Sequence, residues 1–391
     1  MMRVNVPISV NTLNWIMAHA CLDKLPNPIL ENLNAWKAGT KTPTFHQIET
    51  TSKATGIPLG YFFLKTPPTE ELPLVEHRTV DSVELKQPSR NLIDTMHSME
   101  MIQDWTKDYL LSEGESPLNF VGSFKKQRDI LPFASSVRTL LDISADWFTK
   151  VRNTQDAFRF LRDKISNVGV IVMLNGIVGN NTHRPLEIDE FRAFAMLDEY
   201  APLIFINSND SAGGKVFSLL HEFVHLCIGE SSLFNDRYSN HTKVKRTETI
   251  CNAVAAEILV PQSLFIQKWK DAAASLDSDQ AIQTLAKFFK CSITVIARKA
   301  FDNKFIDYAT YDSVAKLSVE HYNEMKKREK ENDRSGGDFY RTTANRIDSR
   351  FFNMLLGSVS EGKTLYSDAF RLTNTNRSTF AKLAEKREGS Q

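Results

Sequence analysis

The chain has 391 residues, 42% of them hydrophobic, and a formal net charge of +1. This length and composition predict a globular protein with two or three domains, and they exclude a fibrous or largely disordered chain. The near-neutral charge excludes a chain-wide attraction to nucleic acids or membranes, so such a partner would need a local surface. The four cysteines form no CxxC pair, and no signal-like or long apolar segment is present, which together predict a reduced, cytoplasmic protein without a membrane segment.

Residues 1–66 predict a small helical domain that ends at the proline-rich stretch KTPPTEELP. Within it, the stretch LNAWKAGTKTPTFHQIETTSKATGIPLGYFF, residues 33–63, resembles the second half of an XRE-type helix-turn-helix domain. The expected recognition segment, residues 22–33, offers Lys24, Asn27 and Asn32 but no arginine, and it contains two prolines and a glutamate. Readout of bases or phosphates usually needs Arg, Lys, Gln or Asn on an exposed helix. Two interpretations therefore stay open: specific DNA binding, and a module that docks on another protein.

Residues 67–129 are expected to form a linker and a helical connection. From Asn91 to Leu111 apolar residues recur at helical spacing over a helical length. Residues 130–275 form the next predicted domain, in which two β-branched runs, 168–179 and 202–209, are bounded by Gly, Asn and Pro. Such runs are typical of short strands, so this domain combines a small sheet with helices.

The segment VFSLLHEFVHLCIG, which begins at residue 216, places His221 and His225 four residues apart, with Glu222 directly after the first histidine. Residues four apart on an α-helix project from the same face, so both imidazoles can reach one tetrahedral metal ion. Zinc lowers the pKa of a bound water towards ~7, and a carboxylate about 100° around the helix is near enough to exchange its proton. The spacing therefore predicts a zinc site with Glu222 as the general base.

The alternative is that the two histidines are core residues that share a helix face by chance. The surrounding sequence favours the metal site. Residues 208–211 offer a helix cap, a strand is expected before the helix, and Phe217, Leu220 and Val224 form a buried stripe along it. A strand, a loop and an HExxH helix in this order are typical of zinc peptidases.

A third protein ligand is needed if the metal is to keep one open position. No histidine follows at a short spacing, so a glutamate from the predicted helix 246–261 is the best candidate, either Glu248 or Glu257. These two differ by about 180° around a helix, whereas Asn252 lies on the face of Glu248 and can hydrogen-bond a ligand imidazole. The neighbours of Glu257 one turn back are apolar, so the geometry favours Glu248. Glu257 is then expected to face solvent or a basic residue.

The segments PLIFINSND, VFSLLHEFVHL and ETICNAVAAEILVP together resemble the ImmA/IrrE metallopeptidase family over roughly residues 130–265. The segment EHRTVD, residues 76–81, resembles the join between an XRE-type domain and the peptidase in longer members. The resemblance implies an α+β, mostly helical, zincin-like (gluzincin) fold with Zn²⁺ as cofactor. It further implies that the metal ligands are His221, His225 and Glu248. The general base is then Glu222, and Asn252 supports a ligand by a hydrogen bond. Cys251 stands where such sequences more commonly have alanine.

Residues 276–391 predict a helical C-terminal region. Within it, residues 279–307 contain two helical runs joined near Ser292, a helix-turn-helix-like pattern for which packing onto the peptidase domain is the favoured interpretation. The charged run at 324–338 predicts the end of a helix and a linker. His241, in the loop after the HExxH helix, is a further candidate to polarise a substrate carbonyl.

Two functions from different classes are compatible with these patterns. The first is a zinc-dependent endopeptidase that cleaves a partner protein, and the family resemblance points to an XRE-type repressor in stress response or mobile-element regulation. The second is a DNA-binding transcriptional regulator or antitoxin whose peptidase-like domain serves as a protein-interaction surface. The intact HExxH and ExxCN patterns favour the enzyme.

Overall fold

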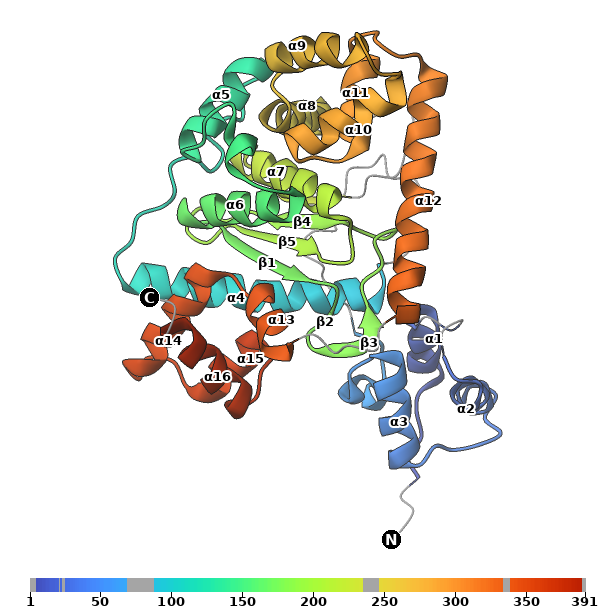
Figure 1. Cartoon of the computed structure of the whole chain (residues 1–391). Helices are drawn as coiled ribbons and strands as arrows, with labels where there is room; N and C mark the ends of the chain where they lie inside the picture. Colours follow the sequence, from blue (N-terminus) through green and yellow to red (C-terminus); the bar gives the residue numbers. More distant parts are fainter. Residues whose placement is uncertain are drawn as a thin grey trace.

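The computed structural model describes residues 5–20, 22, 25–68, 88–234, 246–332 and 338–388. The structure consists of a central body and two small helical units, one formed by the N-terminal part of the chain and one by the C-terminal part. Both units lie on the same side of the body (Figure 1). Among the described residues the fold is mostly helical with two small sheets, as the α+β prediction requires. The N-terminal unit contains α1 (Val10–His19), α2 (Asn27–Lys37), α3 (Phe45–Thr55) and the 3-10 helix η2 (Leu59–Phe63).

The body and the C-terminal unit come next in the chain. The first half of the body contains α4 (Arg90–Ser112), α5 (Ile130–Leu140), η3 (Trp147–Lys150), α6 (Thr154–Asn167), β1 (Ile171–Asn175), β2 (Ile177–Val178), β3 (Asn181–Pro185), β4 (Ala193–Met196) and β5 (Leu203–Asn207). Its second half contains α7 (Ala212–Ile228), β6 (Ser232–Phe234), α8 (Arg246–Leu259), α9 (Gln262–Ala273), α10 (Ser278–Phe289), α11 (Ile293–Asp302) and α12 (Tyr308–Asn332). The C-terminal unit contains α13 (Phe339–Arg346), α14 (Ser349–Ser360), α15 (Tyr366–Thr373) and α16 (Arg377–Glu388).

The larger sheet has the strand order β1-β5-β4-β6. β1 pairs with β5 in parallel, with Ile171 opposite Leu203, whereas β4 is antiparallel to both β5 and β6. β2 and β3 form a separate antiparallel hairpin. Because β5 lies at the centre of the sheet and leads directly into α7, the sheet determines where the HExxH helix begins.

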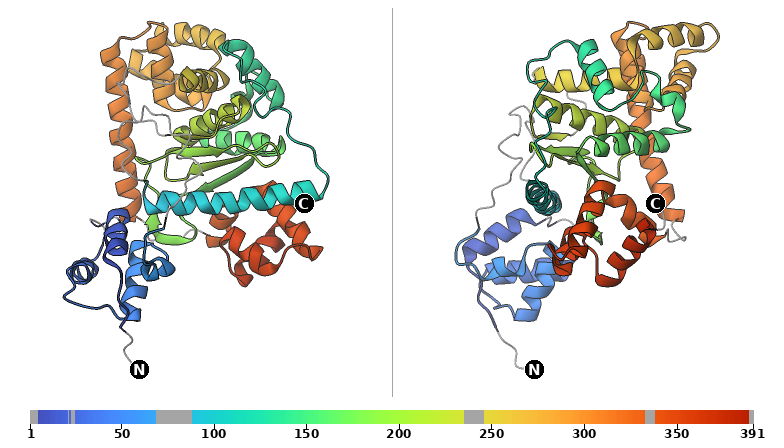
Figure 2. Two further views of the ribbon diagram at one scale, coloured as in Figure 1. Left: turned by 180° about the vertical axis from the view of Figure 1, so that it is seen from behind. Right: turned by 90° about the vertical axis from the view of Figure 1, so that its left-hand side faces the viewer.

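Helices cover both faces of this sheet, with α6 and α7 on one face and α4 on the other (Figures 1 and 2). The side chains of β5 divide between the two layers: Ile204 and Ile206 pack in the core that contains α7, while Leu203 and Phe205 pack in the core that contains α4. This alternation is the expected consequence of the two-residue period of a strand. The buried helix α4 is therefore part of the body's core, although the sequence places it in a connection.

The C-terminal unit covers the outer edge of the sheet at β1. Asp348 accepts a hydrogen bond from the backbone N–H of Val172 at 3.2 Å, and Arg162 donates two to the carbonyl of the same residue. An exposed strand edge is a site for unwanted pairing with other chains. The buried Asp348 side chain and Arg162 occupy the hydrogen-bonding groups of Val172 at this edge.

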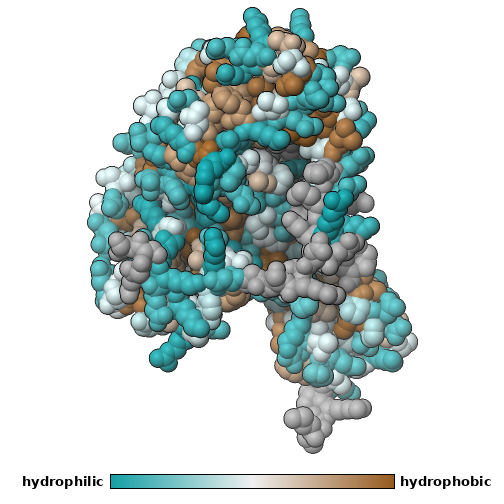
Figure 3. Space-filling view, in the orientation of Figure 1, coloured by the Kyte–Doolittle hydropathy of each residue, from teal (hydrophilic) through white to brown (hydrophobic). Residues whose placement is uncertain are grey.

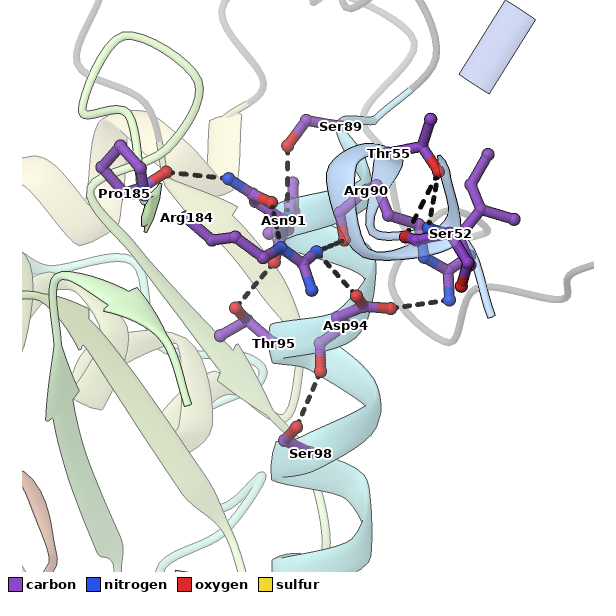
Figure 4. Close-up of polar contacts among 12 residues, drawn as sticks. Ser52, Thr55, Ser89, Arg90, Asn91, Asp94, Thr95, Ser98, Arg184 and Pro185 are labelled. Atoms are coloured by element: carbon purple, nitrogen blue, oxygen red, sulfur yellow. Dashed lines mark hydrogen bonds and ion pairs between the residues drawn. The ribbon is translucent and has the colours of Figure 1, made fainter. Parts of the chain in front are cut away.

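The N-terminal unit contacts the body through Arg184 on the β2–β3 hairpin (Figure 4). The Arg184 guanidinium binds Asp94 at 2.7 Å and Asn91 at 2.9 Å, both on α4. Gly56 ends α3 with φ of +71°, and a Cβ atom there would come within 3.0 Å of the Arg184 guanidinium carbon. Any L-residue at position 56 would therefore strain the backbone and crowd this contact. Beside it, the Arg90 guanidinium lies 5.8 Å from the ring centroid of Tyr61 on η2.

Most elements that the sequence predicts are present. The helix expected over 91–111 is α4, the two expected strands are β1 and β5, and the helical pair expected over 279–307 is α10 and α11, with Ser292 capping α11. The sequence predicts none of β3, β4 and β6, because these strands are short and lack a clear alternation. Lys24, the EHRTVD segment at 76–81 and His241 lie outside the described residues.

On the face seen in Figure 3, hydrophilic side chains dominate and hydrophobic ones form scattered groups. In the described ranges, no single helix is both long and apolar enough to span a membrane. The consecutive helices α8 and α9 are long and apolar enough only when they are taken together, and the chain bends by 61° between them.

Candidate metal centre

Helix α7, which carries the HExxH motif, is tied down at both ends. Ser211 caps its N-terminus by accepting a hydrogen bond from the backbone N–H of Gly214. At its C-terminus Gly229 adopts φ of +90°, and a Cβ there would lie 2.9 Å from the Cα of Gly122. The backbone N–H of Gly122 in turn donates to the carbonyl of Leu226 at 3.0 Å. The loop before α5 therefore satisfies the end of α7 and fixes its position.

Burial of α7 goes beyond the stripe of Phe217, Leu220 and Val224 that the sequence predicts. Every residue from Ser218 to Ile228 is buried, and Phe217, expected in the buried stripe, is only partly so. The sheet covers one side of α7, and helices α6 and α8 cover the others (Figure 1). Its polar residues His221, Glu222 and His225 are consequently removed from water, and each needs a polar partner.

The partner of the two histidines comes from α8. The Nε2 atoms of His221 and His225 lie 3.0 Å apart, and each is 3.3 Å from a carboxylate oxygen of Glu248. The two histidine side chains are buried, whereas the Glu248 side chain is 28% exposed. These three are a group of His, Cys, Asp or Glu residues in the described part of the chain whose ligand atoms lie close enough to hold one metal ion. The group opens towards solvent on the side of Glu248.

The spacing of these atoms fits a tetrahedral zinc ion. Bonds of about 2.0–2.1 Å from zinc to nitrogen and oxygen place tetrahedral ligand atoms about 3.3 Å from one another. The two histidine nitrogens are 3.0 Å apart, and each lies 3.3 Å from a different oxygen of the Glu248 carboxylate, so these separations are close to that value. Two imidazoles and one carboxylate are also a common donor set for zinc sites that keep an open position.

The charges at the site also suit a cation. Burial alone would raise the pKa of Glu248, but its hydrogen bonds with His221 and His225 outweigh that effect and hold the pKa well below its usual range. Glu248 lies in the first turn of α8, where the helix dipole stabilises a negative charge. At 3.0 Å, only one of the two Nε2 atoms can carry a hydrogen directed at the other. An ionised carboxylate beside two converging imidazole nitrogens therefore favours a positive charge between them.

Glu222 lies beside this group without belonging to it. Its side chain is buried, and burial raises its pKa to about 7. The Ser232 hydroxyl on β6 donates a hydrogen bond to Oε2 of Glu222, while Oε1 has no hydrogen-bond partner among the described residues. Sequence reasoning misses Ser232, because the contact joins two elements and no motif marks it. Ser232 therefore fixes Oε2 of Glu222, while Oε1 is available to accept a proton.

Asn252 and Glu257 lie on opposite sides of α8. Asn252 lies near the His221 ring. Glu257 faces away from the histidines and accepts a hydrogen bond from Lys299 at 2.8 Å. Of the two glutamates that the sequence offers as the third ligand, only Glu248 lies at the histidines.

The nearby cysteines do not enter the ligand group. Cys227 and Cys251 are buried, and burial raises the pKa of both thiols. The thiol of Cys251 lies near enough to His225 to raise the pKa of that imidazole, but its sulfur is not among the ligand atoms that converge. A neutral thiol is a poor metal ligand. Cys251 therefore packs beside the site.

Two segments of the chain match protein-family models. Residues 180–301 match the IrrE N-terminal-like domain of the M78 peptidase family, and residues 347–386 match a domain of unknown function, DUF8813. The first match contains α7 and α8 with all three residues of the ligand group, and it supports a metallopeptidase-type domain. It extends further towards the C-terminus than the resemblance over roughly 130–265 suggests. Neither match reaches the N-terminal unit. No curated protein and no solved structure matches the chain significantly.

Proposed function

We propose that the chain is a zinc-dependent endopeptidase with a zincin-like (gluzincin) domain, in which His221, His225 and Glu248 hold the metal. The observation that carries the proposal is the convergence of the two histidine nitrogens, 3.0 Å apart, on the Glu248 carboxylate, whose oxygens each lie 3.3 Å from one of them, beside the buried Glu222 carboxylate. The domain match over 180–301 supports the same class of enzyme. On this proposal the domain occupies about residues 130–275 and lies between a helix-turn-helix domain at 1–66 and the C-terminal region.

The residues of the chain have distinct tasks in peptide hydrolysis. Zinc, when bound, supplies the Lewis acidity that polarises the scissile carbonyl. Glu222 accepts a proton at its free Oε1 from the attacking water and returns it to the leaving amine. A pKa of about 7 suits both transfers at neutral pH. Ser232 holds the other oxygen and keeps the carboxylate directed at the site. Asn252 orients the His221 ring.

The substrate we propose is a protein, an XRE-type repressor in the cytoplasm, as the family resemblance implies. A Glu222→Gln variant keeps the size of the side chain but lacks the proton acceptor, so it should hold a substrate without cleaving it. Proteins that cross-link to this variant in the source cells should include a repressor that the wild type cleaves. Glu230→Gln, at an exposed position just after α7, is the matched control and should cleave normally.

This experiment has a clear negative outcome. If purified wild type contains about one zinc per chain but leaves every protein trapped by Glu222→Gln intact, the peptidase proposal is wrong and the zinc is structural. If the wild-type protein binds no zinc after incubation with zinc, the assignment of His221, His225 and Glu248 as metal ligands is wrong as well.

The second candidate function is DNA-dependent regulation through the N-terminal unit. On α2, the exposed side chains of Asn27, Asn34 and Lys37 could face a DNA groove, but Glu31 lies among them. The helix begins after Pro26, with another proline in its first turn. Specific binding predicts an affinity that falls steeply with salt and discriminates between DNA sequences. A lack of both would leave protein docking as the role of this unit.

A further inference from the structure

A small cavity lies where the C-terminal unit meets the body, on the face of the sheet opposite the candidate metal centre. Its volume is about 40 Å³, and its walls come from α4, β1, β5, the β2–β3 hairpin, α13 and α15. Figures 1 and 2 show the C-terminal unit packed beside α4 at this place. The residues that line this cavity have no role in the proposed peptidase chemistry.

The floor of the cavity is apolar. It is formed by Met99 and Ile102 from α4, Met173 and Phe205 from the sheet, and Leu372 from α15. All five side chains are buried. A volume of about 40 Å³ holds about three waters, since each needs roughly 10–15 Å³. Waters on such a floor would find few hydrogen-bonding partners, so an apolar group is the better occupant.

The rim of the cavity is polar and connects three separate elements. Arg346 at the end of α13 donates a hydrogen bond to the side-chain oxygen of Asn180 at 2.7 Å. The amide nitrogen of Asn180 donates to the backbone carbonyl of Asn374, which caps α15. Asn175 donates to the carbonyl of Gly179 at 2.7 Å. The rim is therefore held in place by its own hydrogen bonds, although it joins segments almost 200 residues apart.

Arg346 has no counter-charge. Its guanidinium is half-buried, no carboxylate forms an ion pair with it among the described residues, and burial alone lowers its pKa. Only one of its five N–H groups has a hydrogen-bond acceptor in the described part of the chain, the side chain of Asn180. Other half-buried arginines of the body, such as Arg184 and Arg192, bind aspartates. A guanidinium at the edge of an apolar cavity favours an anion with an apolar side.

We propose that this cavity binds a short-chain carboxylate, with the carboxylate group on Arg346 and Asn374 and the alkyl chain on the apolar floor. The guanidinium can donate two parallel hydrogen bonds to a carboxylate. A phosphate fits less well, because its remaining oxygens would face the floor without partners. Space for about three waters corresponds to a chain of about three carbons. The ligand contacts α4, the sheet and α15 together, and so links the C-terminal unit to the body.

The test is isothermal titration calorimetry of the full-length protein with sodium propionate. Wild type should bind about one propionate per chain. Arg346→Gln should weaken binding at least about tenfold, since a hydrogen bond to a charged group is lost. Arg341→Gln, an exposed position on the same helix, is the matched control and should bind as the wild type does. Equal dissociation constants for wild type and Arg346→Gln would overturn the proposal.

A chain-length series on the wild type tests the floor without any variant. Propionate should bind about four-fold more tightly than acetate, as one further methylene is buried. Hexanoate should bind more weakly than propionate, because its chain exceeds the cavity. No saturable binding of any of the three, or inorganic phosphate binding as tightly as propionate, would contradict a carboxylate site.

Discussion

The two sides of α8 carry two carboxylates with opposite surroundings, the buried Glu257 and the partly exposed Glu248. Glu257 is balanced: Lys299 donates to it at 2.8 Å, and the backbone N–H of Gln262 lies 3.0 and 3.1 Å from its two oxygens. Glu248 instead faces His221 and His225, whose nitrogens converge on one point. Glu257 and Lys299 are each about 9% exposed, whereas Glu248 is 28% exposed.

The difference shows what separates a structural ion pair from a candidate site. Both carboxylates lie within 3.3 Å of a basic side chain, so such a contact does not by itself identify function. The Lys299–Glu257 pair has matched charges, and Glu257 also accepts hydrogen bonds from the backbone of Gln262. At Glu248 the donor atoms converge with one side open to solvent, which leaves a place for a cation. Substitutions on one side of α8 should therefore leave the properties of the other side unchanged.

The largest effect is expected on the structural side. Lys299→Met leaves the Glu257 carboxylate buried without its cation, and removing one partner of a buried pair costs about 3–5 kcal/mol. The free energy of unfolding should fall by that amount in urea titrations. Lys287→Met, at an exposed position on α10, should change it by less than about 0.5 kcal/mol. The folded Lys299→Met protein should still bind one zinc per chain; a loss of zinc would show that the two sides of α8 are not independent.

Next in size is the loss of a metal ligand. Glu248→Gln should lower zinc affinity by more than about 10²-fold, which exceeds the usual effect of removing a residue that only supports a ligand. Glu257→Gln on the same helix is the matched control and should leave zinc affinity nearly unchanged. Competition with a chromophoric chelator measures both. The reverse order would mean that the wrong face of α8 has been assigned to the metal.

A separation of chemistry from binding is expected at Glu222. Glu222→Gln should retain one zinc per chain, while turnover of a verified protein substrate falls by at least about 10²-fold, because the general base is removed. Metal analysis and a cleavage assay on the same preparation test the two halves. Unchanged cleavage would exclude Glu222 as the base, and lost zinc would make it a ligand.

The smallest effect is expected at Asn252. Asn252→Ala removes the amide near His221 without removing a ligand, so zinc affinity should fall about tenfold, at the lower end of the range for supporting residues. Thr249→Ala, at an exposed position of α8, should have no effect. A change as large as that of Glu248→Gln would show that Asn252 itself binds the metal.

The basic residues of α11 illustrate where sequence reasoning stops. The helix-turn-helix-like pattern at 279–307 contains Arg298 and Lys299, so nucleic-acid contact is the less favoured alternative there to packing on the peptidase domain. In the structure Arg298 pairs with Asp302 on its own helix, and Lys299 is buried against Glu257. The helices were predictable from their period and from the cap at Ser292. The partner of Lys299 was not, because it lies on α8, about forty residues earlier in the chain.

The sequence by itself determined the properties that depend only on helical and strand periods. It determined that His221 and His225 share a face of α7, that Glu248 and Glu257 lie on opposite sides of α8, and that β1 and β5 are strands. These properties are local, because the backbone period alone decides them.

Only the tertiary structure decided which elements meet. It turned the Glu248 side of α8 towards the histidines, brought Ser232 against Glu222, and enclosed a cavity beside Arg346. Contacts of this kind join residues that are distant in the chain, and they depend on how whole helices and sheets pack. The period of a single segment does not determine that packing. The contributions of α8 and β6 to the candidate site could therefore be seen only in the folded structure.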